Sequence, residues 1–109
     1  MRRHEQIPYR PRAYAYARKY LLMYESVFAL EKMRLESFAE SAGYNLAAVF
    51  VEEIDTPLAA FGRLLEAVIQ DQVEYVVIPS MLHFMTLGSP NNIKEYFEAA
   101  TGARVITAV

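Results

Sequence analysis

Six side chains in this 109-residue sequence have the chemistry of a catalytic or anion-binding site. A serine and a histidine lie three residues apart in SMLH, which is a spacing that a nucleophile and its base can adopt. An arginine can neutralise a phosphate, a glutamate can act as general acid or base, and a tyrosine hydroxyl can donate a proton or attack. The candidate pocket residues are Tyr16, Arg18, Tyr20, Glu52, Ser80 and His83.

The serine and the histidine also have a purely structural interpretation. No carboxylate lies near His83 in sequence to orient its ring, and a serine three residues from a histidine is common by chance. Catalytic triads are recognised by geometry and not by sequence order, so the sequence leaves both interpretations open.

The arginine belongs to residues 14–20, YAYARKY, whose alternation is typical of a β-strand. Period two places the three tyrosines and Arg18 on one face and small alanines on the other. A guanidinium on a covered face needs an anionic or hydrogen-bonding partner. We expect Glu52 or Glu53, at the end of the next strand, to supply it, and such a pair is more often structural than catalytic.

Strand and helix patterns alternate along the whole chain. Gly43 and Gly102 are placed to end helices, and Thr56-Pro57 and Ser89-Pro90 are placed to begin them. Residues 46–52, LAAVFVE, suit a strand that is buried on both faces. Strands are expected at residues 12–19, 46–52, 75–79 and 104–109, and helices at residues 26–42, 57–70 and 90–101. The spacing of apolar residues predicts that the first helix buries Val27, Phe28, Leu35, Phe38, Ala39 and Ala42, and that the second buries Leu58, Phe61, Leu65, Val68 and Ile69.

This order predicts an α/β fold of the three-layer, flavodoxin-like kind. We expect a parallel sheet of order 2-1-3-4, with the first strand central and helices on both faces. Sites in such folds lie at the carboxyl ends of the strands, which is where the candidate pocket residues fall. The α/β domain spans residues 12–109, and residues 1–11 form a basic, extended arm.

The formal net charge of −2 hides an asymmetry along the chain. Residues 1–19 carry +5 and the remainder carries −7. The arm either contacts nucleic acid or docks on the acidic body of its own or a neighbouring chain, and we favour docking. Its basic residues are Arg2, Arg3, Arg10 and Arg12.

Several kinds of site and location are excluded by the residues present. The four glycines stand singly and form no phosphate-binding loop, and the lack of cysteine excludes thiol chemistry. Two histidines without clustered ligands do not make a metal centre, so we expect no metal and no cofactor. No apolar run approaches the roughly 20 residues that span a bilayer, and no signal peptide opens the chain. We therefore expect a cytoplasmic protein without membrane contacts.

From about Ala13 onward, the chain resembles the catalytic domain of the serine recombinases, the resolvase/invertase family. The family opens with a strand of the type Y-x-R-x-S and continues through an acidic second strand to a helix of the type R-P-x-x-x-x-L-L. Its third strand leads into a D-R-x-x-R motif. The corresponding segments here are YARKY (16–20), FAESAGY (38–44), VFVEE (49–53), AAFGRLLEAV (59–68) and YVVIPSMLHFMTL (75–87).

The resemblance implies a serine nucleophile that attacks DNA and several arginines that neutralise the phosphate. The nucleophile position holds Tyr20 here, and the helix arginine falls near Leu58. The Asp-Arg pair falls on Leu82-His83, and the last arginine falls on Thr86. Only Arg18 survives, with Glu52 or Glu53 as a stand-in for the acid, so phosphoryl transfer through a serine is excluded.

These departures favour a catalytically inactive resolvase-fold domain that acts as a protein-binding or regulatory module. The alternatives are a recombinase of divergent type, or a small phosphate- or nucleotide-handling site at the strand ends. The apolar segment 81–85, MLHFM, either contacts a partner or covers the core.

We also expect a homodimer or higher oligomer. The last strand, residues 104–109, forms a sheet edge that invites pairing, and the helix before it carries Ile93, Tyr96 and Phe97 on one stripe. The basic arm is expected to reach across to the acidic body of the neighbouring copy.

Overall fold

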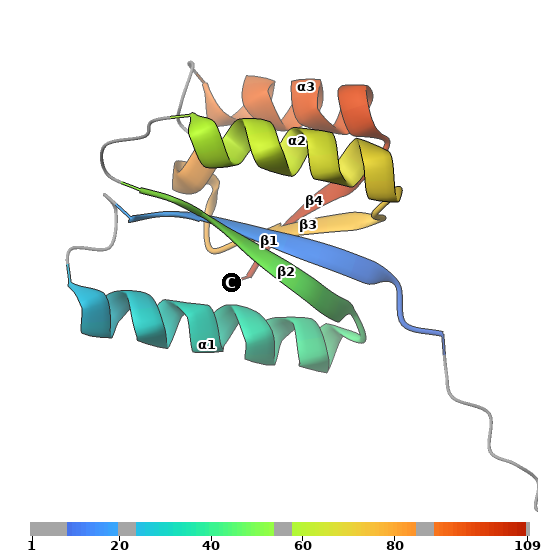
Figure 1. Ribbon diagram of the computed structural model, residues 1–109. Coiled ribbons are helices and arrows are strands. Elements are labelled where there is room, and N and C mark those ends of the chain that lie inside the picture. Colours follow the sequence, from blue (N-terminus) through green and yellow to red (C-terminus); the bar gives the residue numbers. More distant parts are fainter. Residues whose placement is uncertain (1–8, 20–23, 54–57, 85–88, 109) are drawn as a thin grey trace, which may run out of the picture.

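The computed structural model describes residues 9–19, 24–53, 58–84 and 89–108. They form an α/β fold with a four-stranded parallel sheet in the order β2-β1-β3-β4. Figure 1 shows α1 on one face of the sheet and α2 and α3 on the other, which confirms the predicted three-layer, flavodoxin-like class. In chain order the elements are β1 (Arg12–Arg18), α1 (Glu25–Ala42), β2 (Asn45–Glu52), α2 (Ala59–Asp71), β3 (Tyr75–Ile78), the short 3-10 helix η2 (Met81–Phe84), α3 (Pro90–Thr101) and β4 (Arg104–Thr107).

The central strand β1 has two faces of different size, as its alternating sequence predicts. Ala13 and Ala15 lie in a core shared with α1, where small side chains let the helix approach the sheet. Tyr14 and Tyr16 lie in the larger core on the other face, with side chains from α2 and α3. The two cores cover both faces of β1, and its neighbours β2 and β3 cover both of its edges. Arg18, at the end of the strand, is therefore buried.

The helix ends follow local signals. Gly43 and Gly102 adopt the left-handed conformation, with φ of 85° and 79°, and end α1 and α3 as predicted. Helix α3 begins at Pro90, and the carbonyl of Ser89 accepts a hydrogen bond from the Ile93 N–H at 3.1 Å. None of the helices formed by the described residues combines the length and apolarity that a bilayer crossing requires.

Helix α2 begins in a way that the sequence does not predict. The expected start signal, Thr56-Pro57, lies outside the described residues. The helix begins at Ala59, and the carboxylate of Glu52 accepts the N–H groups of Ala60 and Phe61 at 3.0 and 2.9 Å. A side chain from the preceding strand therefore satisfies two of the amides that a helix start leaves open.

The prediction that β2 is buried on both faces is wrong. The strand lies at the edge that the predicted order gives it, and all of its residues before Glu52 are half-buried or exposed. Its apolar run, Leu46–Val51, resembles that of a fully buried strand, but the covering of an edge strand depends on long-range packing that composition does not encode.

The buried sides of two helices agree only in part with the predicted ones. In α2, Ala60 and Leu64 are fully buried, whereas the expected core residue Ile69 is half exposed, and Leu58, just before the helix, is exposed as well. In α1, Leu35 and Ala39 are buried as predicted, and Phe28 and Phe38 are half-buried. The predicted core residues Val27 and Ala42 are exposed, because only one narrow side of α1 contacts the alanine face of the sheet.

The C-terminal strand lies where the sequence places it, at the second edge of the sheet. The stripe assigned to the helix before it is partly wrong. Ile93 and Phe97 belong to the core, but Tyr96 is 58% exposed, because it points away from the core that holds the other two.

Candidate functional site

The carboxyl ends of β1 and β2 bring three of the predicted site residues together. Arg18 lies opposite Glu52 in the sheet register. The Tyr16 hydroxyl donates a hydrogen bond to Glu52 Oε1 at 2.9 Å, and Arg18 Nη1 donates to the Tyr16 hydroxyl at 3.0 Å. All three residues are at most 5% exposed. Arg18 and Glu52, which were expected to pair, are thus linked through the Tyr16 hydroxyl in a buried network.

Glu52 is the centre of this network. Burial alone raises the pKa of its carboxyl, but the N–H groups of Ala60 and Phe61, the Tyr16 hydroxyl and the charge of Arg18 outweigh burial and hold that pKa below its ordinary value. The carboxylate also lies at the start of α2, where helix dipoles favour a negative charge. Glu52 is therefore ionised at neutral pH and is a poor proton donor.

Tyr16 is held as a protonated donor. Burial, followed by its hydrogen bond to Glu52, raises the pKa of the phenol far above its ordinary value. Its ring packs against Phe61 and Phe84, with centroid separations of 5.8 and 6.0 Å. A phenol that deprotonates so reluctantly does not act as a nucleophile near neutral pH.

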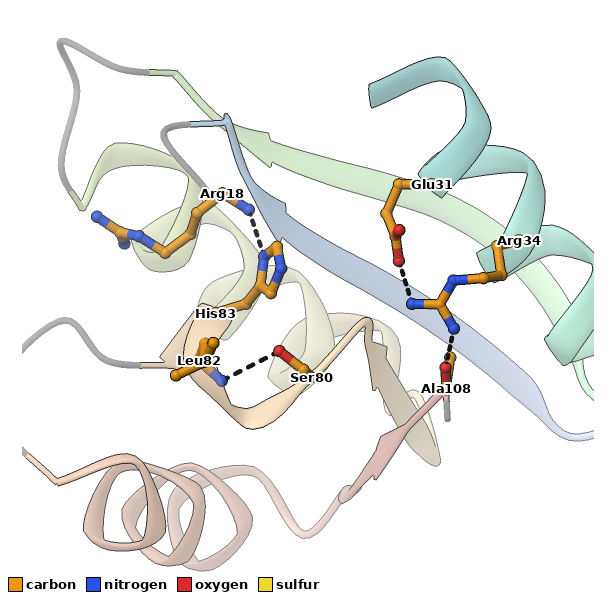
Figure 2. A network of polar contacts seen from close by, with 7 residues as sticks. All are labelled: Arg18, Glu31, Arg34, Ser80, Leu82, His83 and Ala108. Atoms are coloured by element: carbon orange, nitrogen blue, oxygen red, sulfur yellow. Dashed lines mark hydrogen bonds and ion pairs between the residues drawn. The ribbon is translucent and has the colours of Figure 1, made fainter. Parts of the chain in front are cut away.

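His83 joins the site through the backbone of β1. Strand β3 ends at Ile78, so β1 continues beyond its neighbour, and the N–H of Arg18 donates to His83 Nδ1 at 2.9 Å. Figure 2 shows the imidazole of His83 beside the backbone nitrogen of Arg18, whose guanidinium extends away from the ring. Beyond the end of β3, the ring of His83 therefore serves as the hydrogen-bond partner of β1.

This contact supports the structural interpretation of Ser80 and His83. Burial lowers the pKa of His83 to about 4, so the ring is neutral at physiological pH. In the neutral form one nitrogen carries the proton and the other accepts, and here Nδ1 accepts from Arg18. Ser80 Oγ in turn accepts from the Leu82 N–H at 3.3 Å, a local turn contact (Figure 2). The acceptor nitrogen of His83 is therefore already engaged, and the ring is not poised to deprotonate Ser80.

A carboxylate near this histidine, Glu31, was not predicted from the sequence. The charge of Glu31, on α1, acts on His83 and partly opposes the effect of burial on its pKa. Glu31 is paired with Arg34, which also donates to the carbonyl of Ala108 after β4 (Figure 2). The opposite charges of Glu31 and Arg34 three residues apart on a helix were the only sequence signal for this pair.

The predicted pocket is therefore only partly assembled as a site. Tyr16, Arg18, Glu52 and His83 are joined by hydrogen bonds, and Ser80 lies in the same loop as His83. Tyr20 lies outside the described residues.

The other residues of this rim take up separate positions. Glu53 forms an exposed ion pair with Lys19 at 3.4 Å. In the segment 81–85, Phe84 and His83 are buried and Leu82 is exposed, and Met85 lies outside the described residues. Within the described ranges, no group of three or more acidic or histidine side chains is arranged to hold a metal ion.

Comparison with known proteins does not extend this description. No protein-family model matches the chain, and no curated protein matches it. The resemblance to the serine recombinases stays a prediction.

The first prediction concerns the charge of Glu52. We expect Glu52→Gln to lower the free energy of unfolding by about 3 kcal/mol, because it removes a buried anion on which an arginine and a helix start depend. The matched control is Glu53→Gln, whose exposed ion pair is worth less than about 1 kcal/mol. Urea unfolding of both variants measures the difference, and equal losses would contradict the role assigned to Glu52.

The second prediction concerns pH. The pKa of His83 is about 4 in the folded chain, below the ordinary value of about 6.5, so the unfolded chain takes up the proton first as the pH falls. Stability is therefore lost between about pH 6.5 and about pH 4. From about pH 7.5 to about pH 5 this group contributes a loss of about 2 kcal/mol.

The control for this effect is His83→Asn, whose amide oxygen can accept the Arg18 N–H without titrating. The wild type should lose about 2 kcal/mol more than the variant between the two pH values in urea unfolding. Parallel losses in the two proteins would show that His83 does not resist protonation in the folded state.

Proposed function

We propose that this domain is a catalytically inactive, resolvase-like module that binds proteins and associates with copies of itself. The observation that carries the proposal is the mutual engagement of the candidate site residues. Arg18, Tyr16 and Glu52 are buried and hydrogen-bonded to one another, and His83 accepts from the Arg18 backbone. A catalytic constellation needs groups that can reach a substrate, and these groups are turned to the interior of their own fold.

The position of Glu52 argues against the phosphate-handling alternative. Helix starts bind phosphate through their open N–H groups. Here the N–H groups of Ala60 and Phe61 are bound to the carboxylate of Glu52. A phosphate at this helix start would have to displace that carboxylate, or lie beside a second negative charge.

The residues that the family resemblance places on the site argue against strand exchange. Tyr20 occupies the position of the nucleophile and Thr86 that of the last arginine, and both residues lie outside the described part of the chain. At the other compared positions, Leu58 and Leu82 carry no charge, and His83 is neutral near pH 7 because burial holds its pKa at about 4. The loss of each electrostatic stabiliser typically costs about a hundred-fold or more in rate.

The described part of the basic arm supports docking on the chain's own body. Arg10 donates to the Glu40 carbonyl at 3.2 Å and lies 3.6 Å from the Glu40 carboxylate. The Tyr9 hydroxyl donates to the carboxylate of Glu74. These contacts favour a structural role for the arm over a nucleic-acid contact.

The third prediction tests the absence of catalysis. Purified protein should leave supercoiled plasmid DNA uncut, because Tyr20 replaces the serine and most of the arginines are missing. Agarose gel electrophoresis with and without Mg²⁺ measures this. Cleavage that is lost in the Tyr20→Phe variant would contradict the proposal, whereas cleavage unchanged by that substitution would come from another source.

A further inference from the structure

The edge of the sheet formed by β2 carries few of the features that normally protect a free strand. Proteins guard exposed edges with short strands, lysines, prolines or bulges. Strand β2 has eight residues, and its stretch Leu46–Val51 carries no charge and no proline. The protective device that β2 does have is a bulge at Ala47, near the start of the strand, and the residues after it pair regularly with β1. Among the described residues, no strand pairs with the outer side of β2.

The opposite edge is better protected than the sequence suggested. Strand β4 has only four described residues and begins with Arg104. The hollow beside it is lined by Lys94 as well as by Arg104, so two cations border this edge. The greater length of β2, eight residues against four, makes it the more adhesive of the two edges, although the sequence pointed to residues 104–109.

A groove runs beside β2 and extends the surface that a partner could cover. It has a volume of about 410 Å³ and lies between β2 and the C-terminal half of α1, with Glu36 and Glu40 on its helix side, and Arg10, which pairs with Glu40, also lines it. The outer face of α1 next to it exposes Leu30 and Met33, which are 66% and 60% accessible. The edge, the groove and this side of the helix thus lie next to one another, and their apolar side chains are interspersed with the charged residues Arg10, Glu36 and Glu40.

A second copy of this chain fits that surface by symmetry. In an antiparallel pair about a two-fold axis, opposed residues must point to the same face of the sheet. Leu46 and Val49 face the α1 side, and Ala48 and Phe50 face the α2 side. With Val49 on the axis, each Ala48 is opposed by the Phe50 of the other copy, so a small side chain meets a large one.

The charges of α1 also suit two antiparallel copies. Lys32 precedes Glu36 by four residues and so lies on the same side of the helix. A two-fold axis through the paired β2 strands makes the two α1 helices run in opposite directions. Glu36 borders the β2 groove, so this side of each helix is turned toward the other copy. In the proposed pairing, Lys32 of each copy faces Glu36 of the other.

The geometry points to a homodimer in which two β2 strands pair antiparallel and join the two four-stranded sheets into one. This inference rests on the self-association in the proposed function and identifies the surface responsible. The pairing gives the open backbone groups of both edges a partner and covers the apolar run of β2.

The fourth prediction uses one lysine on each edge. Ala47 is exposed on β2, and Ala47→Lys places a charge in the proposed interface, so the dimer dissociation constant should rise by about ten-fold or more in sedimentation equilibrium. The matched control, Thr107→Lys on β4, should leave the constant unchanged. Thermal unfolding of each variant verifies that it is folded.

A disulfide provides a second measurement that does not depend on destabilising the dimer. The chain contains no cysteine, so a single introduced thiol reports one contact. Mild oxidation should link two copies of the Val49→Cys variant and leave the β4 variant Ile106→Cys unlinked.

The outcomes separate this inference from the broader proposal. A wild-type protein that is monomeric at micromolar concentration would overturn self-association and the β2 interface together. A dimer that is lost in Thr107→Lys but kept in Ala47→Lys, or that links through Ile106→Cys alone, would overturn only the β2 interface and favour the C-terminal edge. An open-ended series of oligomers would overturn the closed two-fold pairing.

Discussion

The buried carboxylate of Glu52 is the interaction on which the carboxyl edge of this fold depends. It joins β2 to β1 through the Tyr16 hydroxyl and to α2 through the N–H groups of Ala60 and Phe61. A buried anion is costly unless its acceptor sites are filled, and here strand, helix and arginine act on the same two oxygens. The position of α2 over the sheet is therefore coupled to the identity of one side chain in the preceding strand.

The same contacts engage the groups with which this edge could act on a substrate. Parallel α/β folds expose helix starts and strand ends at this edge, and these normally bind substrates. In this chain Glu52 occupies the start of α2, and His83 completes the hydrogen bonding of β1 where β3 has ended. Groups that would recognise an anion or move a proton instead hold neighbouring segments together.

Much of the fold could be predicted from local patterns, and the failures have a common cause. The alternation in residues 14–20 and the glycine helix stops act within a few residues, so the sequence reveals them. The partial burial of β2 and the cap that Glu52 provides to α2 depend on contacts made only after folding. The apolar run of residues 46–52 therefore predicted burial on both faces for a strand that the predicted order had already placed at an edge.

The sequence predicted which residues meet at the candidate site better than it predicted what each of them does there. The strand-end rule gathered Arg18, Glu52 and His83 correctly, because the carboxyl ends of parallel strands meet at one edge. Their roles could not be predicted, since these depend on burial and on which lone pair each group uses. Glu31 was missed for the same reason, as its nearness to His83 arises from the packing of α1.

The most direct test of this account is a titration with inorganic phosphate, followed by the backbone amide resonances of Ala60 and Phe61. The account predicts that neither resonance shows a saturable shift at millimolar phosphate near neutral pH, because both amides are already bound to Glu52. A saturable shift of both amides, lost on Arg18→Gln, would show that the edge binds anions and would contradict a role limited to structure.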